Sequence, residues 1–221
     1  MIKKEDLGLN GISVYQDSDL YTFTSDSVLL AKFTAVKKGD VIADFCAGSG
    51  IVGFYLYGLN AEKTESLTFF ELQNELSSLC EKSIKENALE EKCKVVKGKL
   101  QDIDKEYNEK FSLIVCNPPY MKADAGEFNK NASRAICMAE VMLSLDELIT
   151  AVAKSLKFGG RVNLVHRADR LAEVLAKLSA KGLEPKKLQL VCPKNKPPYL
   201  FMVEAVKGGK VGLKVLNNIE N

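Results

Sequence analysis

Four residues, Asn117-Pro118-Pro119-Tyr120, stand where a buried strand must end. They follow the apolar run 111–116, and a proline cannot continue a strand because it lacks an N–H group and fixes φ. Asn117 precedes a proline and is therefore biased towards extended geometry. We expect a stiff turn that presents one amide and one aromatic ring at the carboxyl end of a strand, where open α/β sheets bind ligands.

This turn suits chemistry on a planar amino group such as that of adenine. Such an amine is a poor nucleophile, because its lone pair is delocalised into the ring. The side-chain oxygen of Asn117 and the backbone carbonyl of Pro118 can accept hydrogen bonds from its two hydrogens, and the proline ring holds that carbonyl in place. Tyr120 offers a face for stacking, worth about 1–3 kcal/mol per base. We predict that Asn117, Pro118, Pro119 and Tyr120 are catalytic, with no metal.

A second motif, Gly48-Ser49-Gly50-Ile51-Val52-Gly53, lies between a short apolar strand and a helix. Glu71 ends the next strand, where an acid that binds a ribose is expected. Alone, this pattern also allows a nicotinamide or flavin oxidoreductase. Asp44, four residues before the first glycine, would repel a pyrophosphate there and attract a cation such as the ammonium of a methionine moiety. The pattern therefore fits S-adenosylmethionine better than NAD.

Strands alternate with helices along the chain, which indicates parallel βαβ units. We predict an α/β fold with a doubly wound, mostly parallel seven-stranded sheet. The last two strands have no helix between them, so the last strand should be antiparallel. The expected strands are 41–45, 67–71, 93–96, 111–116, 161–165, 187–191 and 200–206. The expected helices begin near 50, 74, 145 and 171, and the third is expected to stop at Gly159-Gly160.

Three segments divide the chain. Residues 1–36 form an N-terminal segment that we expect to cover the cofactor, with a short helix at 28–33 capped by Ser25 or Asp26. Residues 37–207 form the catalytic domain, and residues 208–221 read as a loose C-terminal tail. No internal repeat and no low-complexity segment is present.

The 221 residues carry a net charge of +2 that is unevenly placed. Residues 1–110 hold 14 basic and 19 acidic residues, whereas residues 111–221 hold 17 and 10. The basic half contains the Asn-Pro-Pro-Tyr turn, which suits RNA or DNA, although a lysine-rich surface is an equal alternative. The sequence has no apolar run of about 18 residues and no signal peptide, so we expect no membrane association. Six separated cysteines and a single histidine argue against a zinc site and favour reduced thiols in a cytoplasm.

Together these motifs resemble a known family. The stretches 44–50 and 117–120, with Glu71 between them, resemble the ordered motifs of class I S-adenosylmethionine-dependent methyltransferases that act on amino groups. The stretches 23–30, 164–167 and 193–209 extend the resemblance to the bacterial tRNA (adenine-N6) methyltransferases, which modify the adenosine next to the anticodon of valine tRNA. The similarity covers roughly residues 5 to 212.

The resemblance implies S-adenosylmethionine as cofactor and the anticodon loop of a tRNA as RNA partner. Glu71 would bind the ribose hydroxyls, and Thr24 and Asp26 would lie against the methionine end. The complete set expected to bind the cofactor is Thr24, Asp26, Asp44, Cys46, Gly48, Gly50, Glu71, Leu100 and Asn117. Candidates for phosphate contact are Lys122, Lys130, Arg134 and the loop 194–196. For the oligomeric state, a monomer and a weak dimer stay open.

Lys99, Met138 and Ala139 depart from the family's pattern, and Asn-Pro-Pro-Tyr also occurs in other methyltransferases, so other functions stay open. One is methylation of a different planar amino group, in ribosomal RNA guanine, DNA adenine or protein glutamine. Another is a non-catalytic protein that binds S-adenosylmethionine or RNA. For His166, at the end of the fifth strand, we weigh a structural, hydrogen-bonded role about two to one against the role of a catalytic base.

Overall fold

A computed structural model describes residues 1–20, 25–119 and 143–220. The N-terminal residues form a hairpin of β1 (Ile2–Asp6) and β2 (Ser13–Asp17), followed by α1 (Ser25–Phe33). The first half of the main sheet and its helices are β3 (Asp40–Phe45), α2 (Ile51–Asn60), β4 (Thr64–Glu71), α3 (Asn74–Glu86), β5 (Cys93–Lys97) and β6 (Phe111–Cys116). Short 3-10 turns, η1 (Leu100–Asp102) and η2 (Lys105–Tyr107), lie between β5 and β6.

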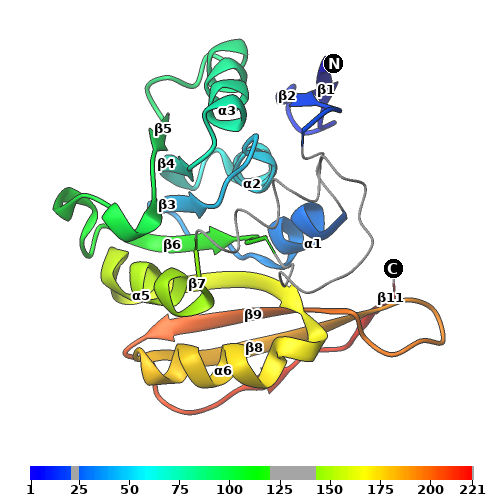
Figure 1. Ribbon diagram of the computed structural model, residues 1–221, viewed down its shortest axis with the longest axis vertical. Coiled ribbons are helices and arrows are strands. Elements are labelled where there is room, and N and C mark those ends of the chain that lie inside the picture. The colour runs from blue at the N-terminus through cyan, green and yellow to red at the C-terminus, as the bar shows by residue number, and fades with distance from the viewer. Residues whose placement is uncertain (21–24, 120–142, 221) are drawn as a thin grey trace.

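The second half continues the sheet to its other edge. Its elements are α5 (Leu145–Ser155), β7 (Leu156–Arg167), the 3-10 turn η3 (Ala168–Arg170), α6 (Leu171–Ala180), β8 (Leu183–Cys192), β9 (Leu200–Lys207), β10 (Lys214–Val215) and β11 (Ile219–Glu220). The strand order is β10-β8-β9-β7-β6-β3-β4-β5, and β11 also pairs with β8. Figure 1 shows this order running from β5 near the top to β8 near the bottom.

The predicted doubly wound, mostly parallel sheet is confirmed, as is the antiparallel last long strand. Strands β3, β4, β5, β6 and β7 pair in parallel, while β9 is antiparallel to both β7 and β8. In Figure 1 the arrowheads of β3 and β6 point one way and that of β9 points the other. The sheet exceeds the expected seven strands because two short strands in residues 208–220 pair with β8. Part of the tail expected to be loose is thus bound to the sheet edge.

Alternation along the strands builds two cores. In β3, Ile42 faces the helices α1, α2 and α3, where it joins Leu30, Phe54 and Cys80. Its neighbours Ala43 and Phe45 face the opposite layer, which contains residues of α5 and α6. Helices on both faces explain why the central strands are almost continuously apolar.

One predicted boundary is wrong. Helix α5 ends at Ser155 and β7 already begins at Leu156, so the Gly159-Gly160 pair lies inside the strand. Phe111 pairs with Leu156 but Leu113 pairs with Arg161, so β7 contains extra residues that bulge out of the ladder. Gly159 adopts φ +74 in this bulge. The glycines therefore mark a strand irregularity, which resembles a helix stop in the sequence.

Candidate active site

The carboxyl ends of β3, β4 and β6 meet at one edge of the sheet. Phe45 pairs with Phe70 on one side and with Cys116 on the other, so the residues that follow these three strands are neighbours. The chain passes from β3 through β4 to β5 on one side and places β6 and β7 on the other. This reversal between β3 and β6 is the position at which open α/β sheets form a ligand crevice.

Asp44 lies at the end of β3 beneath α2 and is only 1% exposed. Its Oδ2 accepts a hydrogen bond from the Gly53 backbone N–H at 2.9 Å. Its Oδ1 is buried and has no hydrogen-bond partner in the part of the chain that the structure describes. Burial, opposed by the Gly53 hydrogen bond, raises the pKa of this carboxyl to about 8. Asp44 is therefore largely neutral at pH 7, so it would acquire its charge only when a cation arrives.

The glycine turn between β3 and α2 has a left-handed backbone at three positions. Cys46, Gly48 and Gly50 have φ values of 60, 59 and 91. A Cβ on Gly50 would lie 2.7 Å from the Phe54 ring, whereas a Cβ on Gly48 would meet no atom within 4 Å. Gly50 is thus required by packing, and Gly48 borders open space where a ligand can approach the backbone. The non-glycine Cys46 in this conformation is a local strain of the type found at functional sites.

Glu71 joins the turn to the end of β4. Its Oε2 accepts from the Gly48 backbone N–H and its Oε1 from the Gln73 backbone N–H, both at 2.8 Å. Glu71 is 6% exposed, and burial raises its pKa despite these hydrogen bonds. Each carboxylate oxygen can accept a further hydrogen bond, so this anchored side chain can still bind hydroxyl groups.

On the other side of the crevice, Asn117 follows β6 and is held from α1. Its Nδ2 donates a hydrogen bond to the Oγ of Ser27 at 3.0 Å. Ser27 lies in the first turns of α1 and is 4% exposed, while Asn117 and Pro119 are partly buried and Pro118 is buried. The contact fixes the amide by its Nδ2 and leaves the donor role to that atom. The sequence does not single out Ser27, although it lies within the stretch 23–30 that carries part of the resemblance.

Two other residues of the expected cofactor set, Asp26 and Leu100, are placed less tightly. Asp26 is partly buried in the first turn of α1, next to Ser27. Leu100 is 7% exposed and packs into the core beside α5, so it can offer a ligand little surface. Lys99 and Asp102, on either side of it, are exposed. Thr24, Tyr120, Lys122, Lys130, Arg134, Met138 and Ala139 lie outside the described residues.

Cys116, at the end of β6, does not have the environment of a reactive thiol. Burial, and then a hydrogen bond with Cys46, raises the pKa of the Cys116 thiol well above its usual range. His166 is also held in a structural way, since its Nδ1 accepts from the Arg167 backbone N–H at 2.8 Å. Burial lowers the pKa of His166 to about 4. Its proton at neutral pH therefore lies on Nε2, as expected of a hydrogen-bonded residue at a strand end.

No group of three His, Cys, Asp or Glu side chains that could hold a metal ion occurs among residues 1–20, 25–119 and 143–220. Within the same ranges, none of the helices has both the length and the apolar character needed to cross a membrane.

Comparisons with known proteins agree with this geometry. A model of the methyltransferase small domain family matches residues 22–180. A tRNA1(Val) (adenine(37)-N6)-methyltransferase of Shewanella putrefaciens is 28% identical over 145 residues, which cover 64% of this chain and 58% of the relative. An enzyme of the same name from Shewanella sp. MR-4 is 25% identical over 163 residues, or 72% and 66% of the two chains. The chain thus matches less than two thirds of the length of these relatives.

Solved structures share the fold at low identity. A predicted O-methyltransferase of Agrobacterium tumefaciens aligns with a TM-score of 0.68 at 20% identity, over 88% of this chain and 86% of that one. The tRNA m1G37 methyltransferase of M. jannaschii aligns with a TM-score of 0.63 at 14% identity, over 95% of this chain and 55% of that one. P. horikoshii TYW2 in complex with MeSAdo aligns with a TM-score of 0.63 at 14% identity, over 94% of this chain and 72% of that one. These likenesses establish the same Rossmann-like architecture.

Proposed function

The chain belongs to the methyltransferase small domain family, and we propose that it transfers a methyl group from S-adenosylmethionine to N6 of an adenine in RNA. The names of the two Shewanella relatives support the adenosine next to the anticodon of valine tRNA as the target. The observation that carries the proposal is the Asn117 amide, which is oriented by Ser27 at the end of β6 and followed by two prolines.

The residues at the ends of β3 and β4 fit this cofactor. The orphaned Oδ1 of buried Asp44 matches an ammonium group, because an unpaired acid in this position becomes stable as an anion only beside a cation. The anchored carboxylate of Glu71 matches the two ribose hydroxyls. The open space at Gly48 lets the backbone of the turn approach the ligand. When bound, the cofactor supplies a methyl group activated by an adjacent positively charged sulfur.

The acceptor side raises the nucleophilicity of the amino group. Asn117 Oδ1 and the Pro118 carbonyl accept hydrogen bonds from its two hydrogens, which draws the nitrogen towards tetrahedral geometry and exposes its lone pair. Both acceptors are fixed before the substrate arrives, one by Ser27 and one by the proline ring, and such preorganisation lowers the barrier. The carbon–nitrogen bond would form as the bond between the methyl carbon and sulfur breaks, which leaves S-adenosylhomocysteine. The amino group would then lose one hydrogen as a proton to solvent. No step requires a charged base, which agrees with a neutral, structurally held His166.

The experiment uses two transcripts of valine tRNA that differ only at the nucleotide next to the anticodon. One carries adenosine there and the other carries guanosine. We expect the purified protein to transfer radioactive methyl from S-adenosylmethionine to the first transcript only, and nuclease digestion to release N6-methyladenosine. Equal labelling of both transcripts would refute the proposed position. Labelling of guanosine instead would move the protein to the class of guanine methyltransferases.

A further inference from the structure

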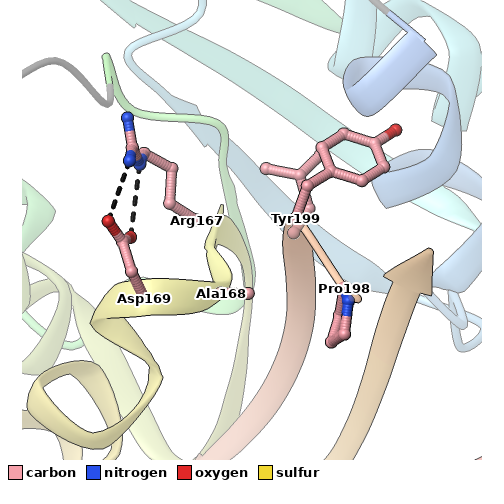
Figure 2. Close-up of a pocket in the computed structure, with 6 residues that line it drawn as sticks. Arg167, Ala168, Asp169, Pro198 and Tyr199 are labelled. Atoms are coloured by element: carbon pink, nitrogen blue, oxygen red, sulfur yellow. Dashed lines mark hydrogen bonds and ion pairs between the residues drawn. The ribbon is translucent and has the colours of Figure 1, made fainter. Parts of the chain in front are cut away.

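A pocket of about 340 Å³ lies at the same edge of the sheet, one strand beyond the Asn117 turn. Its volume is within the range of about 300–1,000 Å³ that ligand sites occupy. Figure 2 shows Arg167 and Asp169 on one side and Pro198 and Tyr199 on the other. It is lined by Arg167, Ala168, Asp169, Pro198, Tyr199 and Leu200.

We propose that this pocket binds a second RNA nucleotide, adjacent to the target, whose base stacks on Tyr199 and whose phosphate faces Arg167. The inference rests on the proposed function, because it assumes that the acceptor is a single-stranded stretch of RNA. It assigns a specificity role to a part of the chain that has no role in methyl transfer itself.

The Tyr199 ring is exposed but its backbone is fixed. Tyr199 is 39% exposed. Its backbone N–H donates to the Val191 carbonyl at 3.0 Å, and its own carbonyl accepts from the Ala168 N–H at 3.0 Å. Two prolines, 197 and 198, precede it. Because the backbone is held in this way, stacking of a base restricts only the two side-chain torsions of the tyrosine, which suits a stacking platform.

The location suits the neighbour of a base in the Asn117 turn. Strand β7 pairs directly with β6, and Arg167 at its end pairs with Leu200 at the start of β9. Strands in a sheet lie about 4.8 Å apart, so the pocket is one to two strand spacings from the turn. Successive bases in a strand are about 3.4 Å apart when stacked and farther apart when the strand is extended. A nucleotide next to the target can therefore reach Tyr199.

The charge around the pocket also favours a phosphate. Arg167 forms two parallel hydrogen bonds with Asp169, from Nε at 3.2 Å and from Nη2 at 2.8 Å. The pair fixes the plane of the guanidinium, but Asp169 offsets its charge and takes two of its five N–H donors. The net positive charge beside the pocket therefore comes from the neighbouring loop. Lys194 and Lys196 are exposed in the same β8–β9 loop and add two further positive charges.

The sequence contains a second sign of this role. The triplet Pro-Pro-Tyr occurs twice, at 118–120 and at 197–199, and each copy follows an asparagine within one or two residues. The first copy begins at the carboxyl end of β6 and the second lies between β8 and β9, at the same edge of the sheet. The same residue pattern thus begins at two neighbouring strand ends, and we take the second copy as the place of a second base.

The test measures binding of a short RNA stem–loop with an adenosine in its loop, in which 2-aminopurine replaces the base next to that adenosine. Stacking on a tyrosine should quench the 2-aminopurine fluorescence. We expect Tyr199→Ala to lose the quenching and to weaken binding of the stem–loop by about 5- to 150-fold. Tyr199→Phe should retain both. The matched control is Phe158→Ala, which removes a 77% exposed ring near the opposite edge of the sheet and should change neither.

The readouts separate this inference from the proposed function. Calorimetry with S-adenosylmethionine should give the same affinity for Tyr199→Ala as for the wild type, which also shows that the variant folds. If the wild type methylates no RNA but Tyr199→Ala still loses binding and quenching, the proposed function fails and the second site stands. If Tyr199→Ala binds and quenches as the wild type does, the second site is refuted, whatever the result for methylation.

Discussion

The two sides of the crevice are built in different ways. On the β3–β4 side, the carboxylates of Asp44 and Glu71 are nearly inaccessible and are held by backbone N–H groups of the glycine turn and its neighbours. On the β6–β7 side, Asn117 is partly buried, and Arg167 and Tyr199 are 49% and 39% exposed. The first side holds buried acids with raised pKa values, and Asp44 has an acceptor oxygen that a small cationic cofactor can pair with. The second side is an open surface that suits a large polyanion.

This difference predicts which property of the protein a variant on each side should change. Substitutions on the β3–β4 side should alter cofactor affinity and stability. Those on the β6–β7 side should alter turnover or RNA affinity and leave cofactor binding intact.

The largest effect should come from Asn117→Ala. Loss of one preorganised acceptor typically costs about 10²- to 10³-fold in turnover. We expect turnover to fall by that amount, because the amino group loses the hydrogen bond that exposes its lone pair. The dissociation constant for S-adenosylmethionine, measured by calorimetry, should stay within a few-fold of the wild type. Turnover near that of the wild type would show that the amide has no role in the reaction.

Asp44→Asn should separate cofactor affinity from stability. Asparagine can keep the hydrogen bond to Gly53 but cannot become an anion, so we expect S-adenosylmethionine to bind at least about tenfold more weakly. Calorimetry of the wild type at pH 7 in buffers of different ionisation enthalpy should also reveal proton release on binding, since Asp44 must ionise. An unchanged affinity would contradict the pairing with an ammonium.

The raised pKa of Asp44 also predicts how the free energy of unfolding should change with pH. The pKa of Asp44 is raised from 3.8 to about 8 by folding. Below about pH 4 both states are protonated and the full stability is present. Between about pH 4 and pH 8 the unfolded state loses the proton and the folded state keeps it, so the free energy of unfolding falls. Thermal melts should show a smaller fall across this window for Asp44→Asn than for the wild type, and parallel curves would exclude a raised pKa.

Ser27→Ala should have a moderate effect on the β6–β7 side. The substitution removes the acceptor of the Asn117 Nδ2 hydrogen bond, so the amide loses a contact that orients it. A hydrogen bond of this type is worth about 0.5–1.5 kcal/mol, and we expect turnover to fall by roughly 2- to 10-fold. Steady-state kinetics should show this in kcat, with no change in the KM for S-adenosylmethionine. A change in that KM alone would make Ser27 a cofactor residue and would blur the division between the two sides.

The smallest effect should come from Lys194→Ala and Lys196→Ala. Both side chains are exposed, and a lysine that contacts one phosphate changes the salt dependence of binding by about one unit of slope. We expect each variant to reduce the slope of log K against log salt by up to that amount for the RNA stem–loop. The matched control, Lys214→Ala in β10, removes an exposed lysine outside this loop and should leave the slope unchanged.

The fold could be predicted well because it depends on local signals. Apolar runs such as 111–116, the glycine turn after β3 and the missing helix before β9 define the strands and their directions. Errors arose where one local signal has two meanings. Gly159-Gly160 resembles a helix stop but forms a bulge. The strand expected at 187–191 in fact begins at Leu183 and shifts register between Pro185 and Lys187. Only pairing with a neighbouring strand decides between these meanings.

The site could be predicted in part. Residue types gave Asp44, Glu71 and Asn117, and the topology brings the ends of their strands together. The sequence could not give the neutral state of Asp44, because that depends on burial under α2. It could not give Ser27 as the partner of Asn117, because 90 residues separate the two. Long-range contacts between elements determine both.

The most direct test of the account compares tRNA nucleosides from cells with and without the gene by mass spectrometry. Valine tRNA should contain N6-methyladenosine next to the anticodon in the wild type and unmodified adenosine in the deletion strain. A plasmid with the wild-type gene should restore the modification, and one with Asn117→Ala should not. Unchanged N6-methyladenosine in valine tRNA of the deletion strain would contradict the proposed function.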